Sequence, residues 1–247
     1  MMQAWKVTLA GAMGGALLAV AIVFATAAAG LLPVSGRQLH DYLLAHPQLV
    51  AEMTDRLQKQ QDDEQARAQS AAMKKIGIAP FFDPKVAFVT GPADAKRTLV
   101  EFYDYDCPYC RASLPAVKKF YEAHKSDTRF AFIEMPLPIH GKNAVIAARA
   151  SLAARLQPDK YVALHFALMG TENPADEQAV YDAAARAGLD LDKLKADMQR
   201  PELAAALQAG KKLAERAGID GTPTFIVNGE VHPGMVDDDT LAEMTKG

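Results

Sequence analysis

The stretch Glu101-Phe-Tyr-Asp-Tyr-Asp-Cys-Pro-Tyr-Cys110 contains the only two cysteines of a 247-residue chain. A disulfide that closes so short a loop constrains the unfolded chain little, so its value as a structural link is small. The same spacing suits thiol–disulfide exchange, because one thiolate can attack a partner's disulfide while the second resolves the mixed disulfide. We therefore predict that Cys107 and Cys110 form a redox-active pair.

Two other roles for this pair remain open, a metal site and a silent structural bridge. Zinc normally takes four Cys or His ligands, and the chain has neither a second cysteine pair nor a close pair of histidines. A two-coordinate Cu(I) site is compatible with two soft thiolates. We favour the redox pair and expect no resident metal or cofactor. The histidines, which we expect mostly at the surface or at helix caps, lie at positions 40, 46, 124, 140, 165 and 232.

The residues on either side of the cysteines predict a strand, a tight turn and a helix. Thr98–Asp106 reads as a buried strand that runs into a loop, and Arg111–His124 carries apolar residues at helical spacing. Cys107 would then lie at a helix N-terminus, where free backbone N–H groups stabilise a thiolate. Pro108 suits the first turn, which needs no N–H. We expect Cys107 to be the exposed nucleophile and Cys110 the buried resolving thiol.

Glu101 lies within the apolar run that precedes the cysteines. A buried carboxylate is costly unless it is paired or protonated, so Glu101 either faces solvent or has a function. Because perturbed acids cluster at active sites, we favour an acid beneath the dithiol that moves protons when Cys110 attacks.

Two motifs carry a resemblance to a known family. The segment 101–110 resembles the active-site segment of the DsbA-like thioredoxin-fold oxidoreductases, and Gly221-Thr-Pro-Thr-Phe-Ile-Val-Asn-Gly229 is similar to a second motif of that family. The likeness extends over residues 80–245. It implies that Pro223 follows a cis peptide bond beside the dithiol and that the backbone of Thr222 pairs with a bound peptide. The residues alone allow a trans turn at Thr222-Pro223 equally well.

This resemblance implies an enzyme that exchanges protein thiols and disulfides. The expected site consists of Cys107, Cys110, Glu101, Pro108, Tyr109, Thr222 and Pro223. Many oxidising relatives have histidine where this chain has Tyr109. Because a phenol cannot supply a positive charge to the thiolate, we expect a milder oxidant. A DsbG-type isomerase or reductase is the alternative enzyme, and a Cu(I)-binding or peptide-binding module without turnover is the alternative from another class.

The N-terminus carries no charge between Lys6 and Arg37. Three interpretations of this segment are open. It is long enough to cross a bilayer as an anchor, and it also resembles a signal peptide with small residues at the cleavage positions. The third interpretation is a buried core helix. We expect residues 1–36 to be a signal peptide or a membrane anchor, with residues 7–32 as the tether to the inner membrane. Either outcome exports the rest of the chain to an oxidising compartment, the bacterial periplasm.

Residues 37–79 are predicted to form a helical arm. Apolar residues recur at helical spacing from Leu39 to Leu57, and His46-Pro47 is expected to separate two helices. The arm is either a solvated spacer or, through residues 37–60, a stalk that self-associates. Relatives with comparable N-terminal helical extensions form oligomers, which favours a homo-oligomer.

Residues 80–247 are predicted to form an α/β domain, a thioredoxin fold with a helical domain inserted at about residues 141–218. Asn228-Gly229 is a strong signal for a two-residue hairpin. The formal net charge of −3 and the absence of a basic patch argue against nucleic-acid binding. The resemblance implies exported substrate proteins that contain cysteine, and a membrane redox partner. The expected strands are Val86–Thr90, Thr98–Tyr103, Arg129–Glu134, Thr224–Val227 and Glu230–His232.

Overall fold

The computed structural model describes residues 36–171 and 176–246, and the chain divides between Gln61 and Asp62 into two units. The first unit contains helix α2 (Gly36–Ala45) and the beginning of helix α3 (Gln48–Ile76). The predicted break at His46-Pro47 is confirmed. The predicted leader or anchor, residues 1–36, lies almost wholly outside the described residues. Among the helices that are described, none is long and apolar enough to span a membrane.

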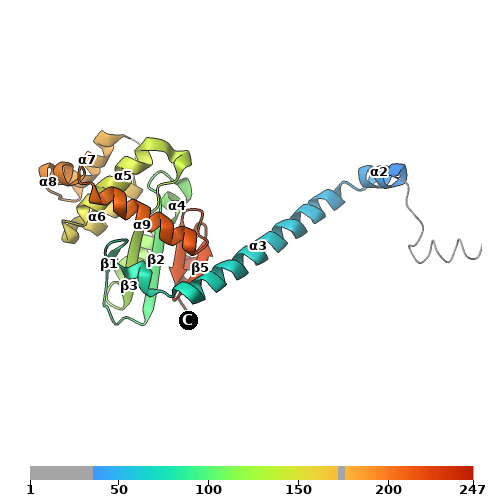
Figure 1. The fold of residues 1–247 in the computed structure, drawn as a ribbon, viewed down its shortest axis with the longest axis horizontal. Helices are drawn as coiled ribbons and strands as arrows, with labels where there is room; N and C mark the ends of the chain where they lie inside the picture. Colours follow the sequence, from blue (N-terminus) through green and yellow to red (C-terminus); the bar gives the residue numbers. More distant parts are fainter. Residues whose placement is uncertain (1–35, 172–175, 247) are drawn as a thin grey trace, which may run out of the picture. The chain divides into compact units, whose positions relative to one another are not determined.

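The second unit contains a five-stranded sheet of strand order β1-β3-β2-β4-β5 (Figure 1). Strands β2 and β3 are parallel and are joined by helix α4 (Pro108–His124), whereas the other neighbouring strands are antiparallel. All five predicted strands are confirmed, with ends that differ by two residues at most. The strands are β1 (Phe88–Thr90), β2 (Arg97–Tyr103), β3 (Thr128–Glu134), β4 (Thr224–Val227) and β5 (Glu230–Pro233).

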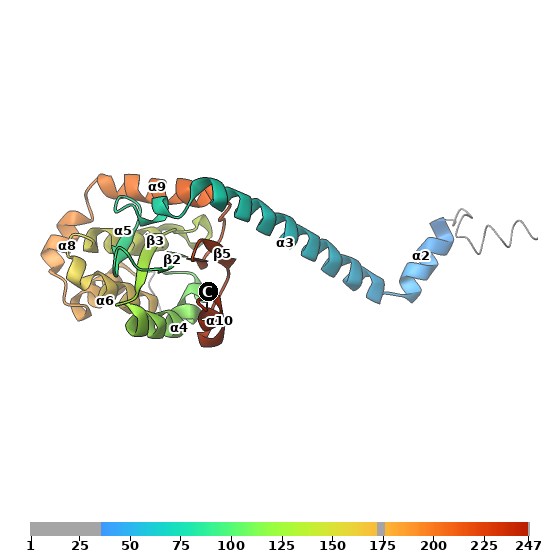
Figure 2. The same cartoon turned by 90° about the horizontal axis from the view of Figure 1, so that it is seen from below.

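Alternation along β2 divides the core into two layers, because successive side chains of a strand point to opposite faces. Val100 and Phe102 pack on the face covered by helix α9 (Glu202–Arg216). Leu99 and Tyr103 pack on the face covered by α4 and by the inserted helices. Figure 2 shows the sheet between α9 on one side and α4 with helix α10 (Asp238–Met244) on the other. The dithiol belongs to the second layer.

The helices between β3 and α9 form the inserted helical domain that the fold class predicted. Residues of α5 that pack inward are mostly alanines, so neighbouring helices can approach closely. Two short 3₁₀ helices, η1 (Ala79–Phe82) and η2 (Pro138–His140), lie before β1 and after β3. The remaining helices are α5 (Gly141–Ala154), α6 (Pro158–Met169), α7 (Glu177–Arg186), α8 (Leu191–Asp197) and, after β5, α10 (Asp238–Met244).

The turn between β4 and β5 confirms the predicted two-residue hairpin. Asn228 and Gly229 have φ angles of 50° and 91°, as a type I′ turn requires. Asn228 also fastens the turn to the sheet, because its Oδ1 accepts a hydrogen bond from the backbone N–H of Thr98 at 3.0 Å. The hairpin therefore holds β4, and with it the loop that precedes β4, against β2.

The C-terminal part of α3 belongs to the second unit rather than to the arm. The side chain of Met73 is buried in the core layer under α9. The amide of Gln69 donates a hydrogen bond of 2.8 Å to the backbone carbonyl of Gly218.

Candidate active site

The first cysteine lies at the start of helix α4, as predicted. Cys107 is the N-cap residue, with extended backbone angles, and Pro108 occupies the first helical turn. The carbonyl of Cys107 accepts the hydrogen bond from the N–H of Arg111 at 3.2 Å. Backbone N–H groups at this end of the helix are therefore free to face the sulfur of Cys107.

The two cysteines lie 3.7 Å apart and are not bonded to each other. Cys110 is fully buried, as predicted. The prediction of an exposed Cys107 is wrong, because only 3% of its surface is exposed. The neighbouring Tyr109, in contrast, is 63% exposed.

The loop before β4 covers Cys107 and explains its burial. The Thr222-Pro223 peptide bond is cis, as the resemblance implied. In its protonated form, the thiol of Cys107 donates a hydrogen bond of 3.2 Å to the carbonyl oxygen of Thr222. The carbonyl of Pro223 accepts a hydrogen bond from the N–H of Gly234, which holds this loop to the segment after β5.

The two thiols have opposite acid–base character. The pKa of Cys107 is lowered to about 5, first by a hydrogen bond with the thiol of Cys110 and then by the N–H groups of Cys110 and Tyr109 and by the side chain of Thr222, whereas burial opposes the shift. Burial is also the main cause that raises the pKa of Cys110, with Cys107 and Glu101 as further causes. At neutral pH the pair therefore presents one thiolate and one thiol.

Glu101 lies on the central strand β2 and is 2% exposed, so the solvent-facing alternative is wrong. Its neighbours across the sheet are Phe132 on β3 and Phe225 on β4. Its Oε2 atom has no hydrogen-bond partner, and the nearest cation-forming group is Nε2 of His165 at 3.7 Å. Glu101 is thus a buried acid whose charge acts on Cys110.

Two histidines near the site were missed by the sequence analysis. His165, on α6, is buried, and its Nδ1 lies 3.1 Å from the hydroxyl of Tyr105. His140 lies at the end of η2, with Nδ1 2.7 Å from Oδ2 of Asp104. A signal for His165 exists in the sequence, because it follows the buried Tyr161 by four residues and so shares its face of the helix.

Asp104 secures the loop that leads to the cysteines. Its carboxylate is buried and accepts hydrogen bonds from the N–H of Asp106 at 2.9 Å and of Leu137 at 2.7 Å, besides the contact with His140. The loop after β2 is therefore tied to the loop after β3, which keeps the start of α4 in place.

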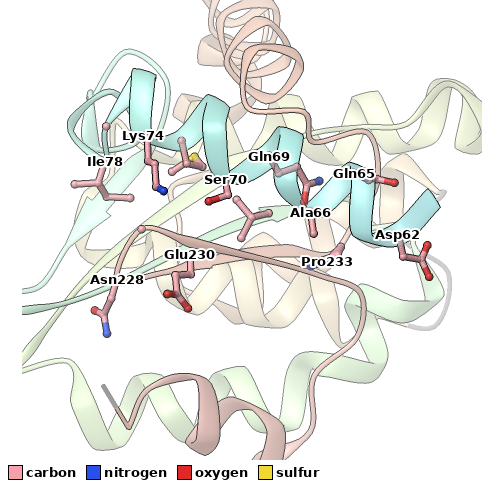
Figure 3. A pocket seen from close by; sticks show the side chains of 14 residues that line it. Asp62, Gln65, Ala66, Gln69, Ser70, Lys74, Ile78, Asn228, Glu230 and Pro233 are labelled. Atoms are coloured by element: carbon pink, nitrogen blue, oxygen red, sulfur yellow. The ribbon is translucent and has the colours of Figure 1, made fainter. Parts of the chain in front are cut away.

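A cavity of the second unit lies away from the dithiol. It measures about 890 Å³ and lies between the C-terminal part of α3 and the β4–β5 hairpin (Figure 3). Gln65, Ser70 and Lys74 line one wall, and Asn228 and Glu230 line the other. None of the predicted site residues lines it.

No cluster that suits a metal ion is present in the described parts of the chain, where no three His, Cys, Asp or Glu side chains converge.

A sheet with a Cys-x-x-Cys pair at a helix N-terminus, opposite a cis-proline, defines a thioredoxin-fold protein with a redox dithiol. Comparison with known families agrees, because the family model described as "Thioredoxin" matches residues 84–246. The chain belongs to the DsbA-like branch of the thioredoxin-fold oxidoreductase family. A second family model, the N-terminal domain of the copper resistance protein ScsC, matches residues 36–64.

Known structures are similar over most of the chain. A thioredoxin-like oxidoreductase from Silicibacter pomeroyi is 40% identical, with 66% of this chain and 92% of that chain covered and a TM-score of 0.59. A linker-deletion mutant of ScsC from Proteus mirabilis is 26% identical, with 87% and 96% covered and a TM-score of 0.63.

Among curated proteins, a Na⁺/H⁺ antiporter NhaA from Herminiimonas arsenicoxydans is 30% identical over 66% of this chain. The match covers 26% of the antiporter. The chain thus spans about a quarter of the length of the first curated relatives that it matches.

Proposed function

We propose that this protein exchanges thiols and disulfides in exported proteins through Cys107 and Cys110. The observation that carries this proposal is the unequal pair of thiols at a helix N-terminus, one with a pKa of about 5 and the other with a raised pKa. A low-pKa thiolate is both a good nucleophile and a good leaving group, which exchange requires in its two directions.

In the oxidising direction, a substrate thiolate attacks the sulfur of Cys107 in the Cys107–Cys110 bridge. The bridge breaks, and Cys110 leaves with the electron pair and takes a proton, for which Glu101 is the nearby donor. A second substrate thiolate then attacks the substrate sulfur of the mixed disulfide. A substrate disulfide forms, Cys107 leaves as its stabilised thiolate, and the substrate has lost two electrons to the dithiol.

In the isomerising or reducing direction, the thiolate of Cys107 attacks a substrate disulfide, and Cys110 later resolves the mixed disulfide. Stabilising the thiolate favours the reduced pair and makes the bridge more oxidising. Tyr109 adds no positive charge, so the protein is a milder oxidant than relatives with histidine between the cysteines. A membrane redox partner resets the dithiol after each cycle.

Substrates bind beside the cis-proline loop. Thr222 lies against the reactive sulfur, with its carbonyl 3.2 Å away, and a substrate chain pairs with its backbone when the mixed disulfide forms. Pro108 and Tyr109 form the rim of the site, where the exposed ring of Tyr109 meets the substrate first.

The protein acts outside the cytoplasm. Two lines of support are the match to the ScsC N-terminal domain and the likeness to a periplasmic thioredoxin-like protein from Salmonella enterica serovar Typhimurium. The charge-free segment 7–32 either is removed on export or tethers the protein to the inner membrane. Mass spectrometry of the mature N-terminus separates a removed leader from a retained tether.

The arm joins copies of the chain through residues 37–60. Its support is a set of large apolar side chains that stay exposed on α2 and on the first part of α3, a surface that a second copy would cover. These side chains, which we call the arm stripe, are Leu39, Tyr42, Leu43, Leu44, Val50, Met53 and Leu57.

Cu(I) binding is a second candidate function. Two free thiols 3.7 Å apart suit two-coordinate Cu(I), which prefers soft thiolate ligands. One equivalent of Cu(I) that protects both thiols from alkylation, with an affinity that survives competition by a chelator, supports this role. Alkylation at the metal-free rate excludes it.

Catalysed exchange with a disulfide-linked fluorescent peptide tests the main proposal. The wild type accelerates exchange with a glutathione buffer, and Cys107→Ser abolishes the acceleration. Equilibration of the same protein with glutathione gives the reduction potential, which decides between an oxidase and an isomerase. Acceleration that survives Cys107→Ser contradicts the proposal.

A further inference from the structure

The buried network next to the dithiol ends on a carboxylate that can only accept hydrogen bonds. Oε1 of Glu134 accepts from the hydroxyls of Ser151 at 2.9 Å and Tyr161 at 3.1 Å. Its other oxygen is paired with the guanidinium of Arg155. Because Glu134 is 2% exposed and is neutralised by Arg155, it is a fixed acceptor at the end of the network.

The remaining hydroxyls must then donate toward Glu134. The single proton of Ser151 is used on Glu134, so the oxygen of Ser151 accepts from Tyr105 at 2.8 Å. Tyr103, whose hydroxyl lies 2.9 Å from that of Tyr161, donates in the same direction. The one hydroxyl proton of Tyr105 is therefore already committed.

This direction determines the tautomer of His165. Its Nδ1 lies 3.1 Å from the oxygen of Tyr105, which has no further proton to give, so Nδ1 carries the hydrogen and donates it. The imidazole ring is held in place by Tyr103 and Phe132, whose ring centroids lie 4.6 and 4.7 Å away. The other nitrogen, Nε2, consequently faces Oε2 of Glu101 at 3.7 Å.

We propose that His165 is a positioning residue for Glu101: with Nδ1 committed to Tyr105, Nε2 is directed at the Glu101 carboxyl 3.7 Å away, so that a protonated His165 forms an ion pair with Glu101 beneath Cys110. A buried carboxylate without a charged partner is costly. An imidazolium at His165 keeps Glu101 available as a base. This inference rests on the proposed exchange chemistry and adds a residue to its resolving step.

The resolving step balances as follows. The thiol proton of Cys110 passes to the Glu101 carboxylate, and the sulfur electron pair of Cys110 forms the bond to the sulfur of Cys107. The bond from Cys107 to the substrate sulfur breaks, and the substrate leaves as a thiolate. The negative charge thus moves from Glu101 through Cys110 to the substrate thiolate. The imidazolium of His165 compensates this charge until the substrate thiolate departs.

The two attacks can be timed separately with 5,5′-dithiobis(2-nitrobenzoate) on the reduced full chain. Attack by Cys107 releases one equivalent of coloured thiolate, and resolution by Cys110 releases the second. His165→Gln should slow the second phase at least about 10-fold and leave the first within about 2-fold, since only the second uses Glu101. An unchanged second phase, or an equal loss in both phases, overturns the proposal.

A double-mutant cycle separates action through Glu101 from a general structural effect. Glu101→Gln should slow the second phase, and adding His165→Gln to it should cause no further loss. If the rate losses of the two single variants multiply in the double variant, the proposal is overturned. Two phases in the wild type support the exchange chemistry whatever His165→Gln does, so the two proposals fail independently.

Nitrogen-15 spectra of labelled histidine report the tautomer directly and need no activity. In the wild type, His165 should carry a proton on Nδ1 at every pH at which the protein is folded. Tyr105→Phe removes the acceptor of that proton and should slow the second phase, whereas the matched Tyr161→Phe, which deletes a hydroxyl that His165 does not contact, should not. A neutral His165 protonated only on Nε2, or equal effects of the two phenylalanine variants, overturns the proposal.

Discussion

Cys107 is activated mainly by its immediate neighbours rather than by a charged side chain. The thiol of Cys110, the N–H groups of Cys110 and Tyr109, and Thr222 lower its pKa to about 5 against the opposing effect of burial. These groups are supplied by the Cys-x-x-Cys spacing, by the helix N-terminus and by the cis-proline loop. The reactive thiolate is therefore stabilised first by the paired thiol of Cys110 and then by the backbone of the helix start and the side chain of Thr222.

Tyr109→His adds an imidazole beside a thiolate that is already stabilised. A protonated imidazole should lower the pKa of Cys107 further and raise the reduction potential, because it stabilises the reduced form. Thiolate absorbance titrated against pH and equilibration with glutathione measure the two shifts together. An unchanged or higher pKa in the variant would mean that the backbone groups and Cys110 already dominate.

The stability of the reduced protein should depend on pH through Cys107. Its folded pKa, about 5, lies below the value near ~8.5 of an unfolded cysteine, so its contribution is fully present above the unfolded pKa and is lost as pH falls through 5. The free energy of unfolding of the reduced wild type, minus that of Cys107→Ser, should therefore rise between pH 5 and about 8.5. Denaturant unfolding under a phosphine reductant measures this difference, and a flat difference contradicts the shifted pKa.

At this scale the sequence identified the residues of the dithiol but not all of their surroundings. Spacing alone located Cys107, Cys110 and Pro108, because a helix start has a local signature. The burial of Cys107 depends on Thr222, more than a hundred residues away, and could not be read from local sequence. His165 was missed for the same reason, since its partners lie on β2 and in the loop after it.

The elements of the second unit follow from local patterns wherever a pattern is strong. The apolar run of β2 and the Asn228-Gly229 turn predicted a strand and a hairpin to within two residues. Helix α3 is different, because its exposed and buried parts form one continuous helix, and polar residues near Gln69 read as a solvated arm. Only the tertiary contacts of Gln69 and Met73 assign this part to the second unit.

Met73→Ala tests this assignment. Met73 is buried among core residues under α9, so its truncation should lower the free energy of unfolding by about 2–4 kcal/mol. Arg67→Ala, in the same helix but exposed and outside the arm stripe, is the matched control and should change it by less than about 0.5 kcal/mol. Denaturant unfolding followed by circular dichroism compares the two. If both substitutions changed the free energy of unfolding by equally small amounts, residues 62–76 would belong to the arm and not to the second unit.

On the scale of the whole molecule, the arm stripe is the feature that bears on assembly. The double variant Met53→Glu/Leu57→Glu places two negative charges on the arm stripe. The control double variant Gln48→Glu/Ala51→Glu places two negative charges on residues of α3 outside the stripe. The proposed self-association predicts that the first variant is a monomer and that the second keeps the oligomeric state of the wild type. Light scattering measures both, and an identical state in all three proteins would make the arm a spacer.

The central claim is that Cys107 attacks and Cys110 resolves, and trapping the intermediate tests it most directly. Cys110→Ser removes the resolving thiol, so incubation with a disulfide-containing protein should accumulate a mixed disulfide. Mass spectrometry of the digested adduct should place the bond at Cys107, and Cys107→Ser should form no adduct and show no turnover. Absence of any adduct in Cys110→Ser, or wild-type turnover in both single variants, would contradict the account.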